Sequence, residues 1–182
     1  GSLMTNEEET YVIDPEFAFY GPMGFDIGAF IGNLLMSYFS HEYRQPLLGN
    51  EPLEYRTWIL DTIASTWNQF ECKFDALWKT HQHEKDPLYF DYPAGKEHAD
   101  NQRRKFIQHI FSDTLGFAAC KMMRRIFGLA KVADIAGIED LKERARIERM
   151  TLQLGKLLVT KRDQFSTIEE VVDRAKAISP LE

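Results

Sequence analysis

The stretch VIDPEFAFYGPMGFDIG, residues 12–28, marks the point where the sequence changes from strand-like to helical. Its β-branched start favours an extended strand, and a Gly-Pro turn at Gly21 follows. Over residues 25–39 apolar side chains recur at helical spacing, and Gly28 and Gly32 are small enough for a neighbouring helix to approach closely. The stretch therefore predicts a short strand that leads into a buried helix.

The residues before this stretch predict a short β-hairpin over residues 3–14. Leu3-Met4 is apolar, residues 6–9 form a polar turn, and Tyr11-Val12-Ile13 has strand character. A hairpin that has no sheet to join is only marginally stable by itself.

The residues after the stretch predict several helices and one loop. Amphipathic patterns cover residues 53–79, 106–115, 117–127 and 138–159. Ser166-Thr167-Ile168-Glu169 has the form of a capping box that opens a last helix ending before Pro180. Proline and glycine between residues 81 and 95 predict a loop. We therefore expect a mainly α fold, a helical bundle preceded by a short β-hairpin, as one unit over residues 1–182.

The composition argues against several classes of protein. The formal net charge is -6 and the pI is near 5.4, whereas binding to a phosphate backbone needs a basic surface, so nucleic acid is excluded as a partner. Cys72 and Cys120 lie far apart, so we expect neither a zinc knuckle nor a disulfide, and predict both to be reduced and partly buried. The longest apolar stretch, residues 27–39, is too short to span a bilayer. A soluble, cytoplasmic protein is expected.

Asp14 and Glu16 are the candidate metal ligands. Side chains two residues apart in extended backbone point to the same side, and Pro15 between them fixes the local φ angle. Two carboxylate oxygens at the end of a strand suit Mg²⁺. The alternative is that both residues close the hairpin and bind nothing.

The residues around this carboxylate pair carry a resemblance to a known family. A strand, Asp-x-Glu, an aromatic residue, Ala, a Gly-Pro turn and Asp-Ile-Gly at the head of a helix resemble the metal-binding segment of the aminoglycoside phosphotransferase and choline kinase-like superfamily. Residues 14–28 are similar to those of the methylthioribose kinases, as are residues 122–130, 137–140 and 155–170. The resemblance implies the C-terminal lobe of a protein kinase-like small-molecule kinase.

The resemblance also implies a role for each candidate residue. Asp14 and Glu16 would hold Mg²⁺, with ATP as co-substrate. Asp26 would be a buried carboxylate that braces the catalytic-loop backbone. Arg124 and Arg125 would bind the sugar hydroxyls through their rigid fork of donors. From the residues alone, Asp26 fits a helix N-cap equally well, and the arginine pair fits a solvated basic face.

Other charged residues have simpler interpretations. Arg103-Arg104 lacks a counterpart in the resemblance and is predicted to be surface charge. His81, His83 and His98 have a generic spacing, so a solvent-exposed loop is favoured over a metal site.

Several parts that phosphoryl transfer requires are not found in the sequence. It has no Gly-rich phosphate loop, strand lysine or catalytic-loop aspartate, and the resemblance implies that the catalytic aspartate lies upstream of Gly1. Gly1-Ser2 either continues the catalytic loop of the family or is a cloning scar. We therefore expect this chain alone to be inactive, and to expose apolar surface that lowers its solubility.

The resemblance implies that the parent protein transfers the γ-phosphoryl group of ATP to the 1-hydroxyl of 5-methylthioribose in methionine salvage, with a homodimer as one option for its assembly. Two alternatives remain open: a related kinase with another hydroxyl acceptor, and a noncatalytic helical binding module. The metal motif by itself does not choose the acceptor.

Overall fold

The computed structural model of the chain describes residues 3–13, 19–82 and 93–181. These residues form the elements β1 (Leu3–Thr5), β2 (Thr10–Val12), α1 (Gly24–Leu47), α2 (Pro52–His81), α3 (Gly95–Phe127), α4 (Ala133–Ala136), α5 (Leu141–Thr160), the short 3-10 helix η2 (Arg162–Gln164) and α6 (Ile168–Ile178). The two strands pair antiparallel, with Leu3 opposite Val12. The predicted mainly α fold with a preceding hairpin is confirmed.

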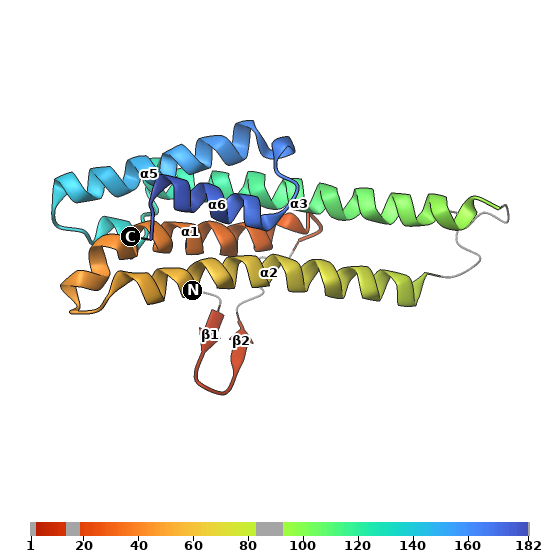
Figure 1. Cartoon of the computed structure of the whole chain (residues 1–182), viewed down its shortest axis with the longest axis horizontal. Helices are drawn as coiled ribbons and strands as arrows, with labels where there is room; N and C mark the ends of the chain where they lie inside the picture. Colours follow the sequence, from red (N-terminus) through yellow and green to blue (C-terminus); the bar gives the residue numbers. More distant parts are fainter. Residues whose placement is uncertain (1–2, 14–18, 83–92, 182) are drawn as a thin grey trace.

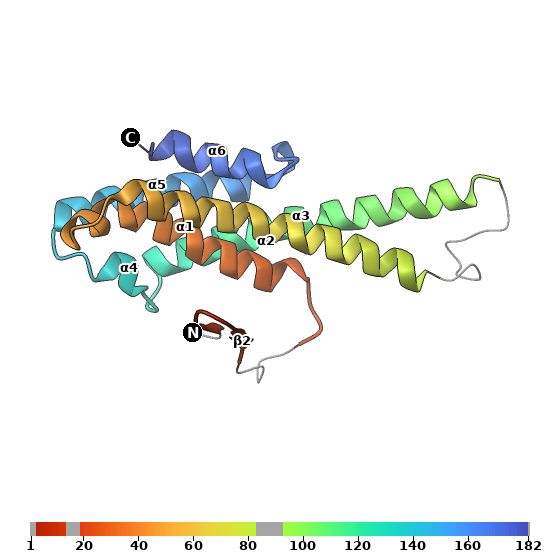
Figure 2. The same cartoon turned by 60° about the horizontal axis from the view of Figure 1, so that its bottom comes forward.

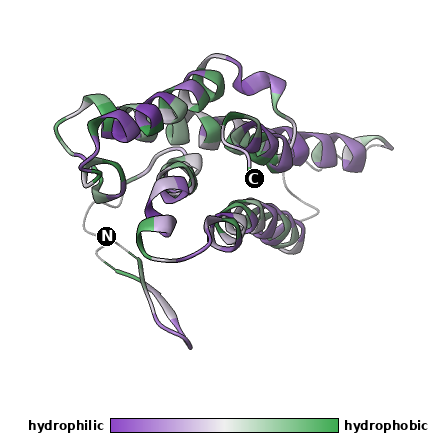
Figure 3. Cartoon of the chain, turned by 60° about the vertical axis from the view of Figure 1, so that its left-hand side comes forward, coloured by the Kyte–Doolittle hydropathy of each residue, from purple (hydrophilic) through white to green (hydrophobic). Residues whose placement is uncertain are grey.

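Helix α1 lies at the centre of the bundle. It packs along α2 and α3, and it also contacts α4 and α5, while α6 contacts α2 and α5 (Figures 1 and 2). The hairpin projects away from the helices, and all of its strand residues are exposed. Figure 3 shows the apolar strands of the hairpin leading to a polar tip.

No helix in the described part of the chain is long and apolar enough to cross a membrane.

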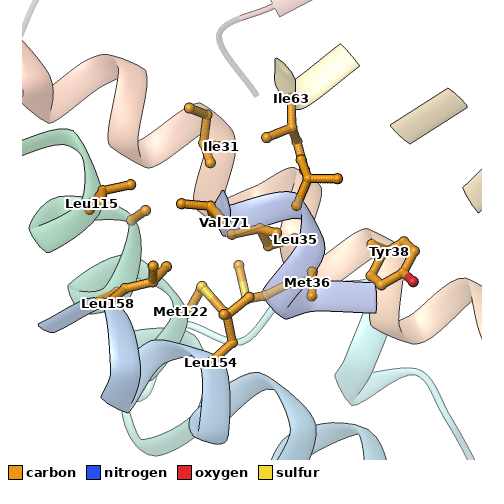
Figure 4. Packing of buried hydrophobic residues seen from close by; sticks show 14 of the residues in the cluster. Ile31, Leu35, Met36, Tyr38, Ile63, Leu115, Met122, Leu154, Leu158 and Val171 are labelled. Atoms are coloured by element: carbon orange, nitrogen blue, oxygen red, sulfur yellow. The ribbon is translucent and has the colours of Figure 1, made fainter. Parts of the chain in front are cut away.

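The core side chains come from all six α-helices of the described residues, with Ile135 as the contribution of α4. In Figure 4 they point toward one another, and five that are 0% exposed are Ile31, Ile63, Leu115, Leu158 and Val171. Burial of this apolar surface is the main favourable term in folding. It fixes α1 against α3, which are the two helices that carry Asp26 and the arginine pair.

Helices α1 and α3 approach closely at two glycines of α1. A Cβ atom on Gly28 would lie 2.4 Å from the carbonyl oxygen of Thr114, and one on Gly32 would lie 2.8 Å from that of Ala118. Both distances are too short for carbon and oxygen, so both positions need glycine. The predicted close approach is confirmed, and because the contacts advance in the same order along both helices, α1 and α3 run in the same direction.

Two helices are longer than the sequence pattern predicts. Helix α1 continues past Phe39 to Leu47, and α3 is a single helix of 33 residues where the pattern suggests two segments joined at Gly116. Glycine in a helix interior costs only about 1 kcal/mol. Tertiary packing of the buried residues on both sides of Gly116 offsets that cost, so the helix continues.

The C-terminal helices begin at other residues than predicted. Helix α5 starts at Leu141 rather than at Ile138, because the Asp140 side chain accepts hydrogen bonds from two backbone amides of the first turn. The capping box of α6 joins Thr167 and Glu170, one residue later than predicted. Helix α4 was not predicted, since four residues are too few for a periodic pattern.

Two predictions about burial are wrong. Arg103 is 5% exposed rather than on the surface, because its Nε donates to Asp75 at 2.7 Å and its Nη1 to Asp100 at 2.5 Å. The partner on α2 lies 28 residues away in sequence, so the local pattern could not reveal the pairing. Cys72 and Cys120 are free, and both are exposed rather than partly buried, since they lie on the outer faces of their helices.

Candidate functional site

The predicted metal ligands Asp14 and Glu16 lie outside the described residues, so their roles stay predictions. Among the described residues, no group of three or more His, Cys, Asp or Glu side chains could hold a metal ion. The proposed Mg²⁺ site therefore depends on the carboxylate pair and is not replaced by another site in the described part of the chain.

Phe19, the first described residue after the carboxylate pair, packs against α1. The ring of Phe19 lies 5.7 Å from that of Phe25, and Phe25 lies 5.2 Å from Phe117 of α3, both edge to face. Such aromatic pairs add about 0.5–1.5 kcal/mol beyond the area that they bury. These ring contacts join Phe19 and the first turn of α1 to the middle of α3.

Asp26 lies in the first turn of α1 and is exposed, whereas the resemblance implies a buried carboxylate. The N-cap alternative is wrong, because the helix begins at Gly24 and Met23 occupies the cap without a side-chain hydrogen bond. A carboxylate in the first turn interacts favourably with the helix dipole. The bracing role of Asp26 stays a prediction.

Arg124 and Arg125 lie in the last turn of α3, so the predicted helical position is confirmed. Arg124 is exposed, and its backbone oxygen accepts a hydrogen bond of 2.8 Å from the Gly128 amide. The Nη1 of Arg125 donates to the carbonyl oxygen of Ala130 at 3.0 Å, while its Nε is buried and has no hydrogen-bond partner. A buried donor without a partner costs about 1–3 kcal/mol, so the unpaired Nε is unfavourable for the stability of this turn.

Lys121 extends the basic surface by one turn. Residues three and four apart lie on one helix face, so Lys121 is a neighbour of both arginines. Burial lowers the pKa of the Lys121 amine, and the positive charges of Arg125 and then Arg124 lower it further. In the described part of the chain, these three cations form no ion pair with a carboxylate, unlike Arg103 and Arg146.

Sequence reasoning overlooked Lys121, although its spacing from the arginines was visible in the sequence. Asp26 on α1 and the arginine pair on α3 lie apart. Since Gly24 faces Thr114 and Gly28 faces Thr114 and Ala118, Asp26 lies level with the middle of α3, about three turns or 15 Å before the arginines. The structure places these residues along one α1–α3 pair and brings none of them into contact.

A cavity of about 410 Å³ lies elsewhere, between the end of α5 and α6. Its lining includes Leu157, Lys161, Phe165 and Arg174 and none of the predicted site residues.

The sequence was compared with known proteins. No family model matches the chain. Methylthioribose kinase 2 of Oryza sativa subsp. japonica is 43% identical over 172 residues, which are 94% of this chain and 40% of that protein. Methylthioribose kinase of Geobacillus sp. (strain WCH70) is 41% identical over 94% of the chain and 38% of its own length, and that of Escherichia coli O45:K1 is 39% identical over 97% and 42%. The chain thus spans about 40% of the length of the curated relatives it matches.

Proposed function

Because this chain belongs to the methylthioribose kinase family, we propose that it is part of an ATP-dependent kinase that phosphorylates the 1-hydroxyl of 5-methylthioribose in methionine salvage. The observation that carries the proposal is identity of 36–43% to methylthioribose kinases from plants and bacteria over most of this chain. The matched region is only part of each relative, so the activity is proposed for the full-length protein.

The proposed reaction moves one phosphoryl group. The bond between the γ-phosphorus of ATP and the oxygen that bridges the β- and γ-phosphates breaks, and ADP leaves. A bond forms between the γ-phosphorus and the acceptor oxygen, and the hydroxyl proton passes to a catalytic base of the full-length protein. Asp14 and Glu16 are proposed to hold Mg²⁺, which when bound neutralises charge on the phosphates. The family resemblance and the residue types support these roles.

Arg124 and Arg125 are proposed to bind the sugar. A guanidinium offers several donors in a fixed plane, which suits two adjacent hydroxyl oxygens. The hydrogen bond from Arg125 Nη1 to Ala130 fixes one end of its fork, and the exposed Arg124 offers donors to a ligand. Holding the sugar in one orientation is itself a large contribution to the rate.

Asp26 is proposed to act through the backbone of the catalytic loop and not on the substrate. The ring contacts of Phe19 and Phe25 hold the segment between the metal motif and α1 in place. A cytoplasmic location and a homodimer are also proposed, and neither is needed for the chemistry.

The test is ADP release by the full-length protein. We expect release with methylthioribose and ATP, its loss in Asp14→Asn, and a rise of about tenfold or more in the KM for methylthioribose in Arg125→Lys, which keeps the charge but loses the fork. Arg104→Ala is the matched control, since Arg104 is an exposed arginine of the same helix whose Nη2 donates to Asn101. Equal turnover of choline or an aminoglycoside would overturn the proposed acceptor, and full activity in Asp14→Asn would overturn the metal role.

A further inference from the structure

Two large apolar side chains stand exposed directly after the arginine pair. Phe127, the last residue of α3, is 74% exposed, and Leu129 is 103% exposed, which is as open as in an unfolded peptide. Single exposed apolar residues are common on protein surfaces and need no explanation. Phe127 and Leu129 differ from such residues because hydrogen bonds fix their segment beside the arginine pair.

The segment that carries them is fixed to the arginines by hydrogen bonds. All three acceptors are backbone carbonyl oxygens. The Gly128 amide donates to that of Arg124, Arg125 Nη1 to that of Ala130, and the Lys131 amide to that of Leu129 at 3.1 Å. Lys131 Nζ also donates to the carbonyl oxygen of Ile126 at the helix end. The chain after α3 is therefore folded back on its own last turn.

Gly128 makes this close return feasible. A Cβ atom at this position would lie 2.4 Å from the carbonyl oxygen of Arg124, which is backbone and cannot move aside. The turn thus sets Phe127 and Leu129 at a fixed place beside the guanidinium groups. Phe127 follows Arg124 by three residues, so the two side chains neighbour each other on one helix face.

The result is a surface with two chemistries side by side. The guanidinium groups of Arg124 and Arg125 suit hydroxyl oxygens, while Phe127 and Leu129 suit an apolar, polarisable group. A 5-methylthio pentose carries both kinds of group, hydroxyls on the ring and a thioether at one end. Sulfur makes a favourable contact with the edge of an aromatic ring.

We propose that Phe127 and Leu129 contact the methylthio group of the acceptor and so set the preference for a thioether sugar over an ordinary pentose. The proposal rests on the proposed function and names residues that select the substrate rather than residues that perform the chemistry. An apolar contact of this size changes affinity by roughly tenfold or more. Ribose has a hydroxyl in place of the methylthio group, so the contact with Phe127 and Leu129 should not raise its affinity.

The experiment uses the full-length protein and two sugars. The KM for methylthioribose and the inhibition constant of ribose, measured as its competitor, are compared for the unmodified protein, Leu129→Ala, Phe127→Ala and Leu129→Met. We expect each alanine variant to raise the KM about tenfold and to leave the ribose constant within about twofold. Leu129→Met, which stays apolar, should restore the KM.

Leu141→Ala is the control, since Leu141 is a 66% exposed leucine on another helix, at the start of α5. Alanine variants that weaken both sugars alike would overturn the proposal and assign Phe127 and Leu129 a purely structural role. Unchanged constants for both sugars would overturn it too. Absence of methylthioribose-dependent ADP release in the unmodified protein would be a different result, because it would overturn the proposed function itself.

Discussion

Arg56 joins the C-terminal end of the chain to the core. Its guanidinium is buried at 1% exposure and donates to the carbonyl oxygens of Pro180 at 2.8 Å and Ser179 at 2.9 Å, and to that of Tyr38 at 3.3 Å. It also lies over the Tyr38 ring, 4.4 Å from the centroid. Glu42 is its nearest carboxylate, at 3.9 Å. Buried charge is tolerated here because nearly every donor has a partner.

Removing Arg56 should therefore cost far more than removing an exposed arginine. We expect Arg56→Ala to lower the free energy of unfolding by about 3 kcal/mol, because the Pro180 carbonyl loses the Arg56 donor and the Ser179 carbonyl keeps only the hydroxyl of Tyr38. Urea denaturation followed by circular dichroism measures the change. Arg104→Ala should stay within about 0.5 kcal/mol of the unmodified chain. Equal effects of the two variants would contradict the role given to Arg56.

At the scale of helices, the sequence correctly predicted features that depend on neighbouring residues and missed features that depend on distant ones. The glycine spacing at Gly28 and Gly32 correctly predicted a close helix neighbour, since a missing side chain is a local fact. The unbroken α3 across Gly116 and the burial of Arg103 were missed, because both depend on residues that are distant in sequence. Sequence periodicity could not predict the partners of Arg56 for the same reason, because they lie 123 and 124 residues away in the chain.

The candidate site shows the same division. The positions of Arg124 and Arg125 on a helix followed from periodicity, and their suggested role followed from family resemblance. The exposure of Leu129 and the unpaired Nε of Arg125 depend on how the chain returns over the end of α3, which the sequence pattern does not specify. The exposure of Asp26 likewise depends on what packs around the start of α1.

The α1–α3 contact predicts opposite effects of the same substitution at two helical glycines. Gly28→Ala should destabilise the chain by about 1–3 kcal/mol, since its Cβ would press on the Thr114 carbonyl and separate the helices. Gly155→Ala in α5 should be neutral or stabilise by up to about 1 kcal/mol, because its Cβ would meet Met123 at 3.5 Å and alanine favours helix. Thermal or urea unfolding of both variants measures the difference. Stabilisation by Gly28→Ala would show that the helices separate without cost.

At the scale of the whole molecule, the far ends of α2 and α3 form an arm that extends beyond the other helices (Figure 1). Helix α2 has no fully buried residue after Trp67. The arm is held instead by partly buried aromatic contacts, such as Trp78 to Phe106 at 5.2 Å, and by Arg103 between Asp75 and Asp100. Regions with few buried apolar contacts open more easily than the core.

The acidic partners make the stability of this arm depend on pH. Hydrogen bonds from Lys79 and then Arg103 hold the pKa of Asp75 below its ordinary value, and Arg103 does the same for Asp100. Folding therefore favours the charged carboxylates. Their contribution is fully present above the ordinary aspartate pKa of about 3.9, and it is lost as the pH falls through the lower folded value.

We accordingly expect the arm to open before the bundle on acidification. Between pH 6 and about pH 3, amide protection in residues 70–81 and 95–104, corrected for the intrinsic exchange rate, should fall before that in residues 147–158 of the core. Hydrogen exchange followed by mass spectrometry measures both regions in one sample. Asp75→Asn should reduce arm protection already at pH 6 and show a smaller further loss on acidification, because one titrating partner is gone. Simultaneous loss of protection in the arm and the core would mean that the ends of α2 and α3 unfold only with the bundle. Unchanged arm protection in Asp75→Asn would mean that the hydrogen bonds of Arg103 add nothing to the stability of the arm.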